Sequence, residues 1–203
     1  MMYLFRLIYI SIFLLAFSGR PAPVAPKLIK HITGPALPAY LPDADDDKAI
    51  IPWITERKLA WNDFESTPEK NTDAVASTST SLGISYKVLD NQLTYHISCN
   101  FSKDKSWVLL KTDYILAHEQ GHFDITEVFA RKLNKELSEY QFNPESFKQD
   151  ISNIYQSVVD EKESYQEAYD GETDHSRHKK IQMEWLDKIQ QMLTETEPYA
   201  NYP

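Results

Sequence analysis

The sequence predicts an α+β fold in which a small antiparallel β-sheet is followed by a helical half. Segments 74–88 and 93–101 alternate polar and apolar residues with the period of a strand, and Asp90-Asn91 between them is a turn signal. The second half of the chain instead repeats apolar residues at intervals of three and four, which is typical of helices.

The N-terminal residues are expected to lie outside the folded domain. Arg6 followed by the apolar run Leu7–Phe17 and small residues predicts a signal peptide over 1–19. The run is short for a bilayer. We therefore expect cleavage and an exported protein, periplasmic or extracellular, without a stable membrane span; an uncleaved N-terminal anchor is the alternative. Residues 20–52 are proline-rich with an acidic run, which predicts a linker. The domain is expected over 53–197.

The β-rich part is expected to begin with Leu59–Phe64, a short strand entering a turn, with Trp61 and Phe64 as core anchors. Segments 74–88 and 93–101 then form a hairpin. Serine and threonine at alternating positions give the first part of this hairpin a polar face. An extended substrate can add to it as a further strand; the alternative is a polar-faced strand without a ligand.

Three helices are expected to follow. The first runs from about 112 to 140, contains no proline and can be capped by Asp113. The second begins at Asn143-Pro144, with Asn as cap and Pro at the first helical position, and ends near 169 because Asp170-Gly171 stops it. The third spans roughly 176–193.

Composition excludes several classes of function. The chain has 203 residues, 42% hydrophobic and 25% charged, and a net charge of −9. Such a charge without a basic stripe argues against a nucleic-acid partner. Cys99 is the single cysteine, so neither an internal disulfide nor a multi-cysteine zinc site can form.

The first predicted helix carries His-Glu-x-x-His, formed by His118, Glu119 and His122. Two residues four apart lie about 40° apart around a helix, so both imidazoles can reach one metal ion. Glu119 lies beside that ion and can accept a proton from its bound water, as in zinc peptidases. Gly121 leaves room for substrate. The alternative is two coincidental histidines; the surrounding helix pattern favours the metal site.

A catalytic zinc ion requires a third protein ligand and one open position. The zincin pattern with a third histidine six residues after the second is absent, because Ile125 and Val128 replace its Gly and His. His31 and His96 lie in the linker and a strand. Most acidic residues of the later helices are expected to lie on solvent-exposed helix faces and not to bind metal.

The polar segment 169–175 supplies the best candidates for this ligand. His175 is the predicted third ligand, with an acidic neighbour as the acceptor for its second nitrogen: Asp170, Glu172 or Asp174. Alternatively Glu172 binds the metal, and His175 or Tyr169 stabilises the oxyanion. His178 is a further candidate donor. The segment also reads as a capped turn with its histidines in solvent.

The chain resembles a family of bacterial secreted proteins, long grouped under a domain of unknown function and predicted to be zinc-dependent proteases. The resemblance covers about 59–193 and rests on these residues: 59–64, 74–81, 118–124 with Ala130-Arg131, Tyr169-Asp170, Glu172-Thr173, His175, Gln182 and Trp185. The family-typical glycine after the last histidine is Ser176 here, which leaves the ligands intact. The resemblance implies a zincin-like fold and zinc-dependent hydrolysis of peptides.

These observations together predict an exported zinc metalloprotease acting on a peptide or protein substrate. Zinc on His118, His122 and His175 lowers the pKa of its water to about 7. Glu119 takes the proton and passes it to the leaving amine, while zinc and Tyr169 or His178 stabilise the oxyanion. The alternatives are a non-catalytic zinc-binding interaction protein of the envelope and a zinc amidase acting on cell-wall peptides.

Overall fold

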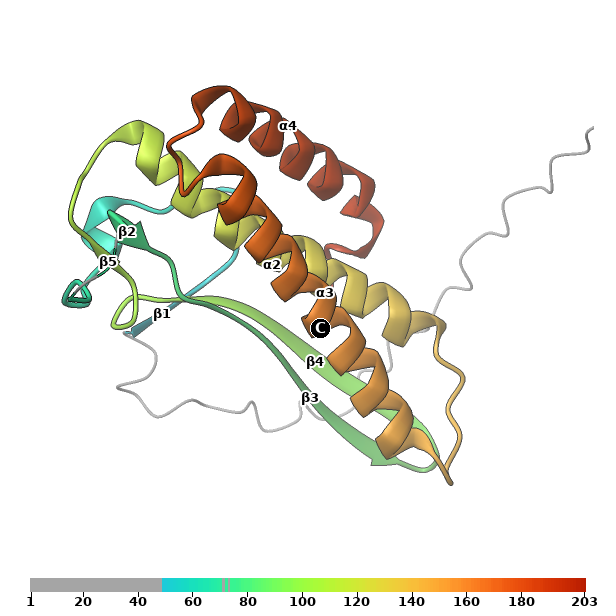
Figure 1. Ribbon diagram of the computed structural model, residues 1–203. Helices are drawn as coiled ribbons and strands as arrows, with labels where there is room; N and C mark the ends of the chain where they lie inside the picture. Colours follow the sequence, from blue (N-terminus) through green and yellow to red (C-terminus); the bar gives the residue numbers. More distant parts are fainter. Residues whose placement is uncertain (1–48, 71, 73) are drawn as a thin grey trace, which may run out of the picture. The chain divides into compact units, whose positions relative to one another are not determined.

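The computed structural model describes residues 49–203 except 71 and 73 (Figure 1). The predicted signal peptide and most of the predicted linker lie outside these residues. The linker's last three residues form strand β1 (Ile50–Pro52), so the fold begins before residue 53. It also extends beyond 197, since the Pro203 carbonyl accepts a hydrogen bond from Ile97 N at 2.9 Å. None of the helices that the structure describes is long and apolar enough to cross a bilayer.

The main sheet has three antiparallel strands in the order β1-β4-β3, which confirms the predicted hairpin. β3 (Thr80–Leu89) and β4 (Gln92–Ser102) are joined by Asp90 and Asn91, with φ of 50° and 57°. Two positive φ values define the tight hairpin turn that matches strand twist, and Asp and Asn tolerate that conformation. The sheet contributes five buried apolar residues to the core: Ile51, Leu82, Ile97, Cys99 and Phe101.

Two strand predictions are wrong. The single strand expected over 74–88 is divided into β2 (Ala76–Ser77), which pairs with β5 (Trp107–Val108), and β3. The chain changes partner at Ser79, whose N–H donates to Ser106 Oγ and whose carbonyl accepts from Ser102 N, both at 2.9 Å.

Segment 59–64 forms the 3-10 helix η1 (Trp61–Asp63) in place of the expected strand. The Asp63 carboxylate accepts a hydrogen bond from Ala60 N at 2.8 Å, and the Asp63 N–H donates to the Ala60 carbonyl. Short-range bonds of this kind stabilise a turn against a strand. Phe64 is buried, as expected of a core anchor, and Trp61 is partly buried.

The helical half consists of α2 (Asp113–Glu139), α3 (Phe147–Thr173) and α4 (Lys179–Glu195). α2 is central, because it packs on β3 and β4 and also contacts both other helices (Figure 1). The apolar residues that recur at helical spacing in α2 are buried, namely Ile115, Phe123, Phe129, Leu133 and Leu137, except Leu116, which is partly buried. The α+β class with three helices is therefore confirmed.

Helix ends differ from the predictions in ways that shape the site. Thr112, not Asp113, caps α2, since its Oγ1 accepts from Ile115 N at 3.1 Å. Asn143 caps only a turn, and α3 begins at Phe147. α3 then continues through Asp170-Gly171 and ends at Thr173, because Gly171 keeps a helical conformation and the left-handed C-cap is Asp174. Asp170 is thus a helical residue and not part of a loop.

Candidate metal centre

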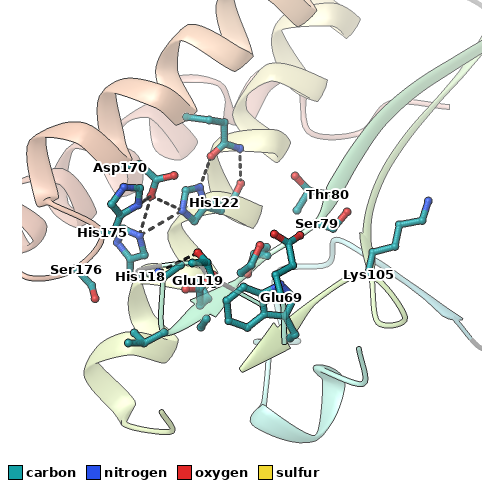
Figure 2. A pocket seen from close by; sticks show the side chains of 18 of the residues that line it. Glu69, Ser79, Thr80, Lys105, His118, Glu119, His122, Asp170, His175 and Ser176 are labelled. Atoms are coloured by element: carbon teal, nitrogen blue, oxygen red, sulfur yellow. Dashed lines mark hydrogen bonds and ion pairs between the residues drawn. The ribbon is translucent and has the colours of Figure 1, made fainter. Parts of the chain in front are cut away.

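Two histidines of α2 and one aspartate of α3 converge on a single point (Figure 2). Asp170 Oδ1 lies 3.1 Å from His118 Nε2 and 3.0 Å from His122 Nε2, and the two Nε2 atoms are 3.3 Å apart. These three side chains form a group that can hold a metal ion, and the described residues contain no second group of this kind. The centre follows from the antiparallel packing of α2 and α3, with the histidines one turn apart.

Close approach of the two helices depends on Gly121. A Cβ placed there would lie 2.5 Å from the hydroxyl oxygen of Tyr169 and 2.9 Å from its Cζ. The space beside Gly121 is therefore filled by the Tyr169 ring, which corrects the expectation that it leaves room for substrate. Tyr169 precedes Asp170, so the missing side chain at 121 helps to set the position of the carboxylate.

The orientation of His122 is fixed by Gln166, one turn before Asp170 on α3. Gln166 Nε2 donates to the His122 carbonyl at 3.0 Å and to Thr126 Oγ1 at 3.2 Å. A carbonyl can only accept, so the amide nitrogen faces His122 O and Gln166 Oε1 faces His122 Nδ1. Nδ1 must then carry the proton. In the neutral imidazole, the lone pair of Nε2 points at the centre, the tautomer that binds a metal.

His118 is held by packing. Its ring stacks on Tyr169 with centroids 4.5 Å apart, and the Tyr169 hydroxyl donates to the His118 carbonyl at 3.3 Å. Its Nδ1 is buried without a hydrogen-bond partner. Burial lowers the pKa of His118 below its ordinary value, which favours the neutral form that can act as a ligand.

Asp170 is ionised in this setting. Burial opposes its charge, but when the two imidazoles are protonated at Nε2 their hydrogen bonds outweigh burial and hold the pKa of Asp170 well below its usual range. Burial likewise works to lower the pKa of His122, yet the hydrogen bond and charge of Asp170 prevail and raise it. The cluster is therefore built around one fixed negative charge.

Glu119 lies beside the centre, and one oxygen of its carboxylate has no hydrogen-bond partner in the described structure. Its side chain is buried, with the residue only 4% exposed, and the unpartnered oxygen is Oε2. An unpartnered buried carboxylate oxygen is costly, and such groups are concentrated at functional sites. Glu119 also lines the cleft described next.

A cleft of about 660 Å³ opens onto the centre. α2 and α3 form one wall, and the segment 74–80 with Lys105 forms the sheet side (Figure 2). Its lining is mainly polar on the sheet side: Glu69, Thr72, Ser77, Thr78, Ser79, Thr80 and Lys105. The cleft exposes the cluster to a ligand that contacts both walls.

His175 reaches the rim of the cluster. Its Nδ1 lies 3.5 Å from Asp170 Oδ1, its side chain is 54% exposed, and it lines the cleft. Asp174, His175 and Ser176 have φ of 49°, 47° and 71°. Three consecutive left-handed residues without glycine are strained, and strain of this kind clusters at functional sites. The strained turn aims His175 toward Asp170.

The other candidates lie away from the cleft. Glu172 is exposed and accepts a hydrogen bond from Trp185 Nε1 at 2.8 Å. Tyr169 is fully buried beneath His118. His178 is exposed, with its Nδ1 3.2 Å from the Glu172 carbonyl. None of the three lines the cleft.

Comparison with known proteins places the chain in a family. The profile of the family described as "Bacterial protein of unknown function (DUF922)" matches residues 36–179, more than half of the chain. The chain belongs to this family. The matched range contains His118, Glu119, His122 and Asp170. No curated protein and no solved structure matched. Membership agrees with the resemblance to a bacterial family of unknown function, while zinc and proteolysis stay predictions.

Sequence reasoning did not select Asp170 or Gln166 as parts of the centre. From the sequence, Asp170 is predicted only as a possible hydrogen-bond partner of His175, because Asp170-Gly171 predicts the end of the helix. A usable signal exists in the spacing: residues 162, 166 and 170 are polar and four apart on a helix whose same side carries buried Val158 and Tyr169.

Proposed function

We propose that this protein is a zinc-dependent metallopeptidase whose metal is held by His118, His122 and Asp170. The mutual distances of the three ligand atoms support this most directly. Bonds of about 2.0–2.1 Å in a tetrahedral zinc site place ligand atoms about 3.3 Å apart, and the observed separations are 3.0, 3.1 and 3.3 Å. The two distances to Asp170 are also ordinary hydrogen-bond lengths, so the support comes from all three ligand atoms lying close enough together to bind one ion.

The donor set also suits zinc. Two imidazole nitrogens and one carboxylate oxygen are common zinc ligands, and three protein ligands with one open position characterise catalytic sites. The open side of the cluster faces the cleft, beside Glu119 and His175. Gln166 supplies the outer hydrogen bond that zinc-bound histidines normally make.

Each side chain then has a separate task. Zinc, when bound, lowers the pKa of a water molecule and polarises a carbonyl group. Glu119, with its free Oε2, accepts the proton of the attacking water and returns it to the leaving nitrogen. His175 donates a hydrogen bond to the developing oxyanion from the rim of the cleft. We assign this role to His175 in place of Tyr169 or His178, because it alone of the three lines the cleft.

The substrate in this proposal is a peptide lying along segment 74–80. β2 pairs with β5 on one side only, and the same segment lines the cleft. A peptide can add to such a segment through backbone hydrogen bonds. The HExxH helix packed on an antiparallel sheet also agrees with the zincin-like fold implied by the resemblance, and the predicted signal peptide would place the enzyme outside the cytoplasm.

Glu119→Gln tests the proposal, since it keeps the shape of the side chain and removes its basicity. Zinc content and melting temperature are expected to match wild type. Hydrolysis of a peptide library by the zinc-loaded protein is expected to fall about 10²–10⁴-fold. Glu136→Gln is the matched control, because Glu136 is exposed on the same helix; it should cleave at the wild-type rate.

Three results would contradict or redirect the proposal. Wild-type cleavage by Glu119→Gln would refute the mechanism. A zinc-loaded wild type that cleaves no peptide would favour the non-catalytic envelope protein. Cleavage confined to cell-wall peptides would identify the amidase alternative.

A further inference from the structure

Lys162 lies on the same face of α3 as the metal cluster. Lys162, Gln166 and Asp170 follow one another at intervals of four residues, and all three line the cleft. The Lys162 side chain is only 8% exposed. Lys105, the lysine on the sheet side of the cleft, is exposed (Figure 2). Lys162 therefore brings a fixed, largely desolvated positive charge to the wall of the cleft.

The ion pair made by Lys162 leaves its charge poorly compensated. Its Nζ lies 2.7 Å from Glu163 Oε1, but the Glu163 side chain is 58% exposed. Lys162 makes no other ion pair within the described residues. A lysine ammonium has three donors, and a buried charge needs close partners to offset its desolvation. An anionic group of a ligand in the cleft would meet these donors.

The other charges of the cleft have less influence on an incoming group. Glu69 and Lys105 are exposed on the sheet side (Figure 2), and Glu163 is more than half exposed. Water and salt screen such charges strongly, whereas a buried charge is screened much less. Away from the metal cluster and the neighbouring Glu119, Lys162 therefore dominates the electrostatic selectivity of the cleft.

We propose that Lys162 selects substrates carrying a carboxylate three or four residues from the scissile bond. Eight residues of helix separate Lys162 from Asp170, about 12 Å at 1.5 Å per residue. An extended peptide rises about 3.3 Å per residue, so this distance corresponds to three or four residues. The carboxylate belongs either to an acidic side chain or to the peptide's C-terminus. This inference rests on the proposed peptidase function and names its substrate class.

Peptide binding tests the proposal separately from catalysis. The probes are acetylated octapeptide libraries with one glutamate, or glutamine at the same position, each with a free or an amidated C-terminus. Dissociation constants are measured on the zinc-loaded Glu119→Gln protein, so that bound peptides stay intact. Lys162→Met removes the charge, Lys162→Arg keeps it, and Lys148→Met is the control, since Lys148 is exposed on α3 and does not line the cleft.

A carboxylate preference of about tenfold is expected, the size of one hydrogen bond between charged groups. It should vanish in Lys162→Met and persist in Lys162→Arg and Lys148→Met. Preference for glutamate assigns the carboxylate to a side chain, and preference for the free terminus assigns it to the C-terminus. Equal binding of all four libraries, or a preference that survives in Lys162→Met, overturns the proposal. Carboxylate-selective binding without cleavage by wild type refutes the peptidase function and leaves the Lys162 site standing.

Discussion

Replacing Gly121 by alanine tests the contact that sets the distance between α2 and α3. The new Cβ would lie 2.5, 2.9 and 3.0 Å from Oη, Cζ and Cε1 of Tyr169. Tyr169 cannot swing aside easily, because its ring is fully buried between His118 and Trp185, with centroids at 4.5 and 5.5 Å. The two helices must therefore separate, or the Tyr169 ring must shift.

The expected magnitude is the difference of two opposing effects. Overpacking a buried site costs about 1–3 kcal/mol, and alanine gains about 1 kcal/mol over glycine in a helix. The net loss is up to about 2 kcal/mol, which lowers Tm by up to about 8 °C in a domain of this size. Gly171→Ala is the matched control, because nothing lies within 4 Å of its Cβ. It should gain up to about 1 kcal/mol, raising Tm by about 2–4 °C.

Thermal unfolding of the metal-free proteins, followed by circular dichroism, measures both changes. The sign difference between the two variants is the decisive result. Because Tyr169 adjoins Asp170, Gly121→Ala should also weaken metal binding about tenfold or more, as outer-sphere changes do. If Gly121→Ala stabilised the protein as much as Gly171→Ala, Tyr169 would not cover position 121, and the proposed packing at the centre would be wrong.

Further predictions concern other parts of the structure. Thr112→Ala should lower the free energy of unfolding by about 1 kcal/mol, because it removes the N-cap of α2; urea titration measures it. Arg131→Met should lower the free energy of unfolding by about 3–5 kcal/mol, since it leaves the buried Glu127 carboxylate without its ion pair at 2.7 Å. A decrease below about 1 kcal/mol in the same urea titration would contradict this prediction. Zinc at 100 times its Kd should stabilise the fold by about 2.7 kcal/mol, and a melting temperature unaffected by zinc would exclude binding. Mass spectrometry of the native protein should show loss of residues 1–19; an intact Met1 would argue against cleavage.

The sequence was sufficient for the fold class and for the elements whose pattern is strong. The long apolar periodicity of α2 and the Asp90-Asn91 hairpin were predicted correctly, because both signals are local. Segment 74–88 was not, since its division depends on the distant Ser102 and Ser106.

The sequence predicted the part of the centre that α2 contributes, but not the part that α3 contributes. His118, Glu119 and His122 are placed together by helical spacing alone. Asp170 depends on where α3 ends, and the apparent stop at Gly171 was misleading because three residues without glycine, 174–176, adopt the left-handed conformation instead. The turn contains a short-range hydrogen bond from Ser176 N to Thr173 Oγ1, but a left-handed helix end without glycine is uncommon, so the sequence pattern does not predict it.

Zinc stoichiometry of the wild type and three single variants tests the central claim most directly. Asp170→Ala and His175→Ala remove neighbouring side chains that both line the cleft, but only Asp170 belongs to the cluster of ligand atoms. Elemental analysis after dialysis should find one zinc per chain in wild type and in His175→Ala, and a large loss in Asp170→Ala equal to that in His118→Ala. Retention of zinc by Asp170→Ala together with its loss from His175→Ala would contradict the account and make His175 the third ligand.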